Sequence, residues 1–275
     1  MSAPPHALSF ARNPMIRKEL RQRLRERRGW ILPSLYLVVV AAVATFAYYE
    51  MTASEGGHIQ GAEIGVMMFL VAAYTQLSLL LLLSPIFSAG ALTIEKEQRT
   101  LPALLVTLLG GYRIWWGKLV ASLLFVFLLL VAALPILSTA FAFGGISLWP
   151  VFSATMTTVI ILLTINAISL YWSSAFRRSV VATAVSYVTV VILTIVTFII
   201  FLATMSASKA TTWTHLSFLK KLPLYCNPVF FLTLSFSPVK MLYPDWFISF
   251  GTFAGLGAIA TALTLWNLSR SGESS

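Results

Sequence analysis

The sequence predicts an all-α membrane protein that crosses the bilayer six times. Of its 275 residues, 58% are hydrophobic and only 10% are charged, whereas a soluble domain carries about 25% charged residues. Five charge-free tracts reach the roughly 20 residues that a transmembrane helix requires. They are residues 29–49, 64–94, 119–176, 179–208 and 246–269. The apolar runs are continuous and do not alternate, which excludes a transmembrane barrel.

The third tract is long enough for two spans. It holds 58 residues, and residues 144–150 inside it read Gly-Gly-Ile-Ser-Leu-Trp-Pro. Glycine and proline at this density interrupt a helix. The chain is therefore predicted to be a single transmembrane domain, residues 1–275, with six spans.

The distribution of basic residues predicts the orientation. With six spans, one side of the membrane holds fifteen Lys and Arg residues and the other side holds four. Cytoplasmic loops carry the excess of basic residues, so both termini are expected in the cytoplasm. The net charge of +10 mostly marks this membrane face, and no soluble basic domain for nucleic-acid binding is available.

The N-terminal region predicts an amphipathic helix at the membrane interface, residues 13–28. Asn13-Pro14 is typical of a helix start, and Ile16, Leu20 and Leu24 share one face. The helix is expected to lie along the cytoplasmic surface, either as a topology signal alone or also as a contact for a cytoplasmic partner. Its candidate contact residues are Arg17, Lys18, Glu19 and Arg21.

The second span is longer than a bilayer requires. Its 31 uncharged residues, 64–94, form a helix of about 46 Å at 1.5 Å per residue, against a hydrocarbon core of about 30 Å. We expect this span to tilt, to kink at Pro85, or to project into the cytoplasm.

Three polar residues are predicted within spans, Tyr74, Gln76 and Asn166. Polar groups at such depth face other helices or a water-filled path. Two interpretations stay open: hydrogen bonds between helices, or a substrate path lined by these side chains.

Residues 205–245 form an outer segment rich in aromatic residues and leucine. Asn227-Pro228 again predicts a helix start. The run 228–236 has nine residues, about 14 Å as a helix, which is half a bilayer. We expect a re-entrant or interfacial helix that packs against the spans.

Residues 95–118 form a charged loop between the second and third spans. Leu101, Leu104, Leu105, Leu108 and Leu109 fall on one face of a short helix. Thr100 is its expected N-cap, and Gly110-Gly111 ends it.

The sequence offers no nucleotide site and no catalytic set. Gly111 to Lys118 approaches a phosphate-binding loop, but it has five intervening residues instead of four and lacks the following hydroxyl. The three histidines lie in a tail and in outer loops, without the companions that a metal site requires. No pair of carboxylates falls within a span. The single cysteine, Cys226, excludes an intramolecular disulfide.

The loop carries a family resemblance. The run 89–105, AGALTIEKEQRTLPALL, followed by Gly117-Lys118-Leu119, resembles the signature of type-2, exporter-like ABC transporter permease subunits. The stretch 17–28 resembles that family's amphipathic N-terminal helix, and 173–178 its basic loop between spans four and five. Arg99 replaces the usual glycine, and Gly110 stands where proline is common.

The resemblance implies a coupling helix that sits in a groove of a separate ATP-hydrolysing subunit. The implied coupling residues are Glu95, Glu97, Arg99, Thr100, Leu104 and Leu105. It further implies two permease chains, alike or different, above two ATPase chains, in a prokaryotic cytoplasmic membrane. ATP and Mg would be bound by the partner, with no cofactor and no enzymatic activity in this chain.

The expected function is export of a substrate, and the uncharged spans favour a lipid-like or amphipathic one. Two alternatives remain. The chain could be a non-transporting membrane anchor or mechanotransmission subunit of an ABC complex, or an intramembrane enzyme. The absence of buried ionisable groups argues against the enzyme.

Overall fold

The computed structural model describes residues 28–54, 61–98, 111–208, 218–236 and 243–273, and the described residues form helices and short connections without any strand. The predicted interfacial helix, residues 13–28, lies outside these residues except for Arg28, which begins α2. The predicted coupling helix 101–109 also lies outside them. The elements are α2 (Arg28–Ser54), α3 (Gly61–Ser88), α4 (Thr93–Glu97), α6 (Gly111–Phe143), α7 (Leu148–Ala175), α8 (Ser179–Val191), the π-helical turn η2 (Ile192–Val196), α9 (Thr197–Ser208), α10 (Phe218–Tyr225), α11 (Pro228–Phe236) and α12 (Tyr243–Glu273).

Six helical segments in the described part of the chain are long and apolar enough to cross a membrane, as the sequence predicts. They are Ile31–Ala53, Gly61–Glu97, Trp115–Phe143, Leu148–Ala175, Ser179–Ala207 and Pro244–Arg270. In the most apolar 18-residue stretch of each span, the second, third and fourth bury 44–50% of the residues, whereas the first buries 17% and the fifth 11%. Spans two, three and four are therefore the centre of the bundle, and spans one and five lie at its periphery.

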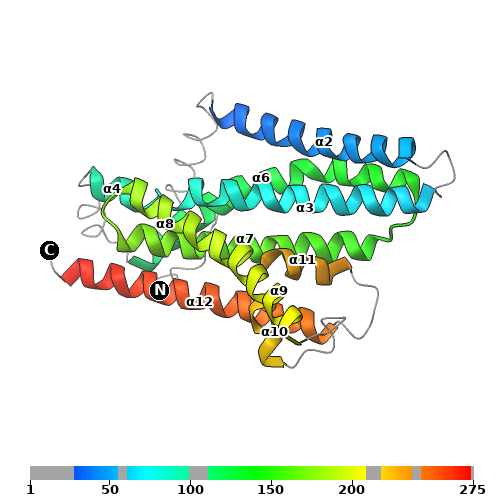
Figure 1. Ribbon diagram of the computed structural model, residues 1–275. Helices are drawn as coiled ribbons and strands as arrows, with labels where there is room; N and C mark the ends of the chain where they lie inside the picture. Colours follow the sequence, from blue (N-terminus) through cyan, green and yellow to red (C-terminus); the bar gives the residue numbers. More distant parts are fainter. Residues whose placement is uncertain (1–27, 55–60, 99–110, 209–217, 237–242, 274–275) are drawn as a thin grey trace, which may run out of the picture.

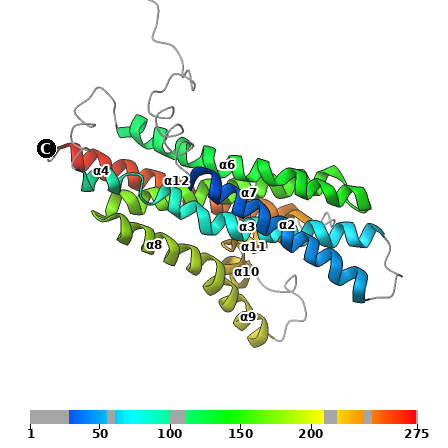
Figure 2. The ribbon, with the colours of Figure 1, turned by 90° about the horizontal axis from the view of Figure 1, so that it is seen from above.

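The long helices α2, α3, α6, α7 and α12 run roughly side by side along one direction (Figure 1). Helix α7 packs against α12, α3, α8 and α11, while α3 packs against α6 and α2. Segments α8, η2 and α9 form one side of the bundle in the second view (Figure 2). Both views place the end of α12 at the same end of the bundle as α4. We call this end the α4 end.

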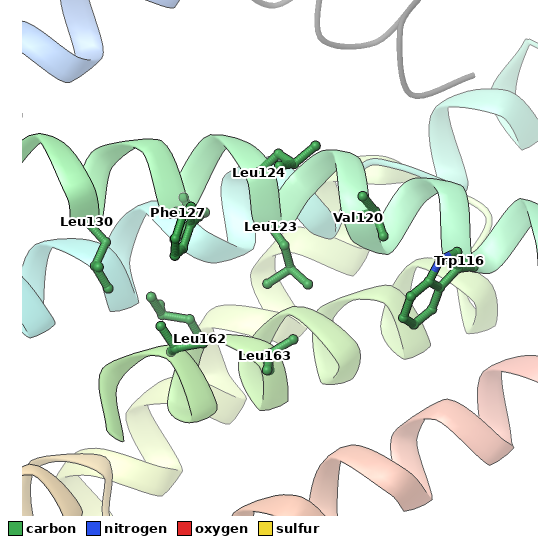
Figure 3. Close-up of a pocket in the computed structure, with 10 residues that line it drawn as sticks. Trp116, Val120, Leu123, Leu124, Phe127, Leu130, Leu162 and Leu163 are labelled. Carbon is green, nitrogen blue, oxygen red and sulfur yellow. The ribbon is translucent and has the colours of Figure 1, made fainter. Parts of the chain in front are cut away.

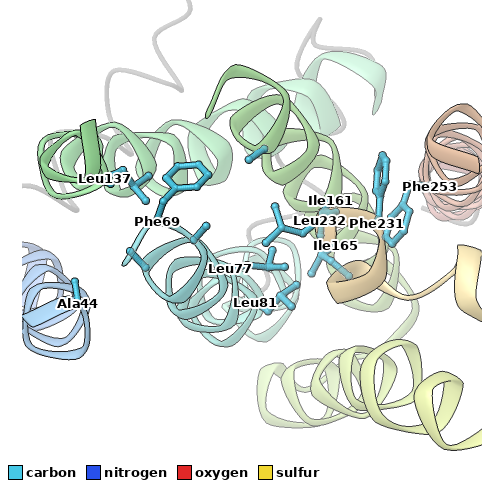
Figure 4. Close-up of a cluster of buried hydrophobic side chains, with 14 of the residues drawn as sticks. Ala44, Phe69, Leu77, Leu81, Leu137, Ile161, Ile165, Phe231, Leu232 and Phe253 are labelled. Carbon is cyan, nitrogen blue, oxygen red and sulfur yellow. The ribbon is translucent and has the colours of Figure 1, made fainter. Parts of the chain in front are cut away.

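The core lies between α3, α6, α7, α11 and α12 (Figure 4). Phe69 and Leu77 of α3 and Ile161 of α7 belong to this cluster, and Phe231 of α11 stacks on Phe253 of α12 with ring centroids 5.3 Å apart. In a bilayer these contacts gain stability from close packing, because lipid tails are as apolar as the side chains.

The predicted turn between spans three and four is confirmed, and its glycines have a structural reason. Gly144 and Gly145 adopt φ values of 79° and 81°, a backbone region that residues with a Cβ rarely enter. A Cβ on Gly145 would also lie 2.2 Å from the carbonyl oxygen of Ala62. The turn is thus packed directly against the start of α3.

The second span differs from a single long helix. Helix α3 continues through Pro85 to Ser88, and the chain then makes a turn before α4 begins at Thr93. The break therefore comes after Ser88 and not at Pro85, because Ala89 N–H still bonds to the Pro85 carbonyl at 2.9 Å. The single helix expected over the apolar run 64–94 is therefore divided into α3 and the start of α4.

In the outer segment the helix at Pro228–Phe236 has the predicted bounds. Asn227 caps it as expected, since Asn227 Oδ1 accepts the N–H groups of Val229 and Phe230 at 2.9 and 3.1 Å.

The last span contains three glycines that differ in their surroundings. A Cβ added at Gly251 or Gly255 would have no neighbour within 4 Å, whereas a Cβ added at Gly257 would lie 3.5 Å from Thr164 Oγ1. Of these three glycines, Gly257 is therefore the one that packs closely against another helix of this chain, α7.

Candidate functional site

The start of α4 is held by a side chain from the end of α7. The N–H groups of Leu92 and Thr93 donate to Ser173 Oγ at 2.9 and 3.1 Å, and all three residues are buried. The first N–H groups of a helix have no partner within the helix. Ser173 satisfies two such donors from another element and so fixes α4 to the fourth span.

Lys96 places a cation at the C-terminal end of α7. Its Nζ donates to the carbonyl oxygens of Ser174 and Phe176, the latter at 3.3 Å, with Ser173 O at 3.5 Å. The last carbonyls of a helix lack intrahelical donors and carry partial negative charge. The ammonium group satisfies these carbonyls and stabilises the end of span four.

Glu97 performs the opposite role at the start of α8. Glu97 Oε1 accepts from the backbone N–H of Ser179 at 2.7 Å and from Ser179 Oγ at 3.0 Å. The residue before α8, Arg178, provides no side-chain cap of its own. A carboxylate at a helix N-terminus is favourable because of the exposed N–H groups and the helix dipole.

Glu95 connects α4 to the beginning of span three. Its Oε1 lies 2.7 Å from Lys118 Nζ, and the Lys118 side chain is only 4% exposed. A buried ion pair contributes little net stability, but loss of one partner is strongly destabilising. The pair brings together the two flanks of the charged loop predicted from the sequence.

We define the α4 junction as Glu95, Lys96, Glu97, Lys118, Ser173 and Ser179. Helix α12 connects to it through Ser174, whose Oγ accepts from Asn267 Nδ2 at 3.2 Å and whose carbonyl accepts from Lys96. Beneath it lies an apolar cluster of Trp115 and Leu119 from α6, Leu170 from α7 and Leu268 from α12. Five elements therefore meet at the α4 end, in the part of the chain nearest the loop 99–110.

Among the described residues, no hydrogen bond joins the three polar span residues to one another. Tyr74 shares a hydrogen bond of 2.8 Å with Thr233 of α11. Asn166 is fully buried; its Nδ2 donates to Leu162 O at 2.7 Å, and its Oδ1 has no partner among the described residues. Gln76 is also buried.

An apolar pocket of about 280 Å³ lies between α6 and α7 (Figure 3). Trp116 stands at one end and Leu130 at the other, with Leu123, Phe127 and Leu163 between them. Trp116 and Leu130 are fourteen residues apart in one helix, about 21 Å at 1.5 Å per residue. The pocket therefore runs lengthwise along the span.

The comparison with protein families decides the class of this protein. The model of one family, described as ABC-2 family transporter protein, matches residues 14–271. The chain belongs to this family. The match covers all six spans and the charged loop, and it identifies the chain as the membrane permease of an ABC transporter, which works with an ABC ATPase. A search of curated proteins found no match.

The resemblance drawn from residues 89–105 is thus confirmed at the level of the family. An ABC-2 permease is the transmembrane component of its transporter and is generally not itself catalytic. Among the described residues, no group of three or more His, Cys, Asp or Glu is placed to hold a metal ion.

The predicted coupling residues divide into two groups. Glu95 and Glu97 lie in the α4 junction, where both carboxylates bind groups of this chain. The other coupling residues, Arg99, Thr100, Leu104 and Leu105, lie outside the described residues, as do Arg17, Lys18, Glu19 and Arg21 of the interfacial helix. Contact of any of them with the ATPase stays a prediction.

Sequence reasoning missed Lys96 and Ser173 as members of the site. Lys96 binds backbone carbonyls from a segment about 80 residues away, and backbone acceptors leave no trace in a sequence. For Tyr74 the structure shows the hydrogen bond between helices, the first of the two interpretations left open.

Proposed function

We propose that this ABC-2 permease couples ATP hydrolysis by a separate ABC ATPase to outward movement of a substrate. The α4 junction carries the proposal. It ties both flanks of the loop 99–110 to spans three, four and five by hydrogen bonds and an ion pair. Force applied to that loop by an ATPase subunit therefore reaches three spans at once.

The charges at the junction support a rigid connection. Lys96 binds the end of α7 and Glu97 binds the start of α8, so displacement of α4 moves the facing ends of spans four and five together. The Lys96 contacts are partly buried and charge-assisted, which makes them stronger than neutral hydrogen bonds. The Glu97 contact is exposed and contributes about 1 kcal/mol.

The assembly follows from the same proposal. Two permease chains pair in a prokaryotic cytoplasmic membrane with their termini in the cytoplasm, and two ATPase chains bind ATP and Mg beneath them. Spans one and five bury little of their surface within the chain, which supports their covering by lipid and by a second permease chain.

The proposed substrate is lipid-like or amphipathic. The pocket between α6 and α7 supports this class, because its lining residues are all apolar and its volume of about 280 Å³ is about twice that of an apolar cavity that holds one benzene molecule. A space of this size suits part of an acyl chain.

Reconstitution tests the proposal. The permease and its ABC ATPase are placed in liposomes that contain a fluorescent phospholipid, and the lipid in each leaflet is measured with and without ATP. We expect ATP-dependent movement between leaflets, and none with an ATPase that cannot hydrolyse ATP. Hydrolysis without movement of any lipid or amphipathic probe would contradict export and favour the mechanotransmission alternative.

A further inference from the structure

The fifth span is interrupted by a π-helical turn. Between α8 and α9, η2 covers Ile192–Val196, and Thr197 N–H bonds to Ile192 O, five residues earlier. Turns of this kind are rare, and those that persist inside α-helices are frequent at functional sites. None of the η2 residues is fully buried, and Leu193 is the η2 residue that packs against the core cluster.

Asn227 binds this turn from the outer segment. Its Nδ2 donates to Thr194 O at 2.8 Å and to Thr197 Oγ1 at 2.9 Å. Thr197 Oγ1 in turn donates to Leu193 O at 2.7 Å. Two carbonyls of the turn, those of Leu193 and Thr194, thus receive side-chain donors. These donors stabilise a backbone path that lacks the regular i to i−4 ladder.

The other end of the same amide holds α11. Asn227 Oδ1 accepts from Val229 N and Phe230 N, and the residue is only 2% exposed. The amide nitrogen of this buried side chain therefore binds span five, and the amide oxygen caps the start of α11. Hydrogen bonds in such a low-dielectric setting are costly to break without replacement.

Helix α11 is anchored on its far side to the centre of the bundle. Ser235 Oγ and Thr157 Oγ1 of α7 share a hydrogen bond of 2.6 Å, and Thr233 bonds to Tyr74 of α3. Phe231 stacks on Phe253 of α12. A displacement of α11 would therefore also move its contacts with α3, α7 and α12.

We infer that Asn227 is a positioning residue that makes the π-helical turn of span five and α11 move as one unit during transport. Glu97 ties the start of span five to the α4 junction, so span five receives movement at one end. Asn227 passes that movement to α11 at the other. The inference rests on the proposed ATP-driven function.

Three substitutions separate this role from simple capping of α11. Asn227→Ser keeps a hydroxyl that caps α11 but is too short to bind Thr194 or Thr197. Thr197→Val removes one acceptor on span five and keeps the shape and the cap. Thr233→Val is the matched control, because it removes a hydrogen bond of α11 to α3 and leaves both contacts of Asn227 intact.

The first measurement is amide hydrogen exchange of the full chain in nanodiscs, without the ATPase. We expect Asn227→Ser to exchange roughly fivefold faster over residues 190–200, as loss of one or two ordinary hydrogen bonds implies. Thr197→Val changes in the same direction, and Thr233→Val stays at the wild-type rate. Unchanged exchange in Asn227→Ser, or an equal increase in Thr233→Val, would overturn the assignment.

The second measurement repeats the exchange in the complex with its ABC ATPase, with and without ATP. In the wild-type complex we expect ATP to change exchange in both 190–200 and 228–236. In Asn227→Ser we expect the response to persist in 190–200 and to be reduced in 228–236, where the contacts of α11 with α3, α7 and α12 remain. An undiminished response of 228–236 in that variant overturns the inference. A wild-type complex that does not respond to ATP contradicts the proposed function and the joint movement, while the first measurement still decides whether Asn227 holds the turn.

Discussion

Glu95 and Lys118 form a 2.7 Å ion pair between the end of span two and the start of span three. The two residues flank the loop in which the sequence places the coupling helix. Because the Lys118 side chain is 4% exposed, its charge depends on groups supplied by the protein. The pair therefore sets the separation of the two flanks of the loop.

Glu95→Gln is expected to destabilise the protein. It removes the carboxylate that faces the buried Lys118 ammonium, and because Glu95 is 17% exposed the loss is expected to be smaller than the about 3–5 kcal/mol of a fully buried pair. The measurement is thermal unfolding in detergent. Glu63→Gln is the matched control, because Glu63 is exposed at the start of α3. The double variant Glu95→Gln with Lys118→Met should recover much of the loss, and a double variant no more stable than Glu95→Gln would show that the pair is not the cause.

Glu97→Ala is expected to loosen the first turn of α8. It removes the acceptor for Ser179 N–H and Ser179 Oγ, and loss of such a cap costs about 1 kcal/mol. Hydrogen exchange over residues 179–185 should rise about fivefold, while residues 148–160 of α7 stay unchanged. Ser179→Ala, which keeps the backbone donor, should have a smaller effect. Equal effects of the two variants would contradict the cap.

The turn between spans three and four provides a matched pair of glycines. Gly144→Ala incurs only the cost of a left-handed backbone, about 1–2 kcal/mol, because nothing lies within 4 Å of its Cβ position. Gly145→Ala adds a clash with the Ala62 carbonyl. We expect a clearly lower unfolding temperature for Gly145→Ala than for Gly144→Ala, and equal temperatures would refute the packing of this turn on α3.

Asn166→Leu distinguishes folding from transport. The Asn166 Oδ1 atom is buried without a partner among the described residues, so replacing the amide by an apolar side chain is expected to change stability by less than about 1 kcal/mol. If Asn166 lines the substrate path, ATP-dependent transport falls in the same variant. Normal transport with normal stability would remove Asn166 from the path.

Much of the fold follows from the sequence because the signals are local. The length of each apolar tract, the two glycines at residues 144 and 145, and the Asn227-Pro228 start of α11 each specify structure within a few residues. The family also follows from one short run, residues 89–105, which the family match confirms.

The remaining features depend on contacts between distant segments. Lys96 binds backbone carbonyls of Ser174 and Phe176, and nothing in the type of either acceptor residue marks this role. The π-helical turn at Ile192–Val196 lies in a charge-free run, and Asn227, which binds it, is about 30 residues away. The sequence predicts that Asn227 is an N-cap, but it does not indicate that the same side chain also binds Thr194 and Thr197 of span five.

The central claim is that residues 99–110 transmit force between an ABC ATPase and this permease. The most direct test is co-purification of the ATPase with wild-type permease and with Leu104→Glu/Leu105→Glu, which places charges on the leucine face of the predicted coupling helix and leaves the α4 junction unaltered. We predict that the wild-type protein retains the ATPase, that the double variant loses it at least tenfold, about 1.4 kcal/mol, and that both have the same unfolding temperature. Full retention of the ATPase by the correctly folded double variant would contradict the claim.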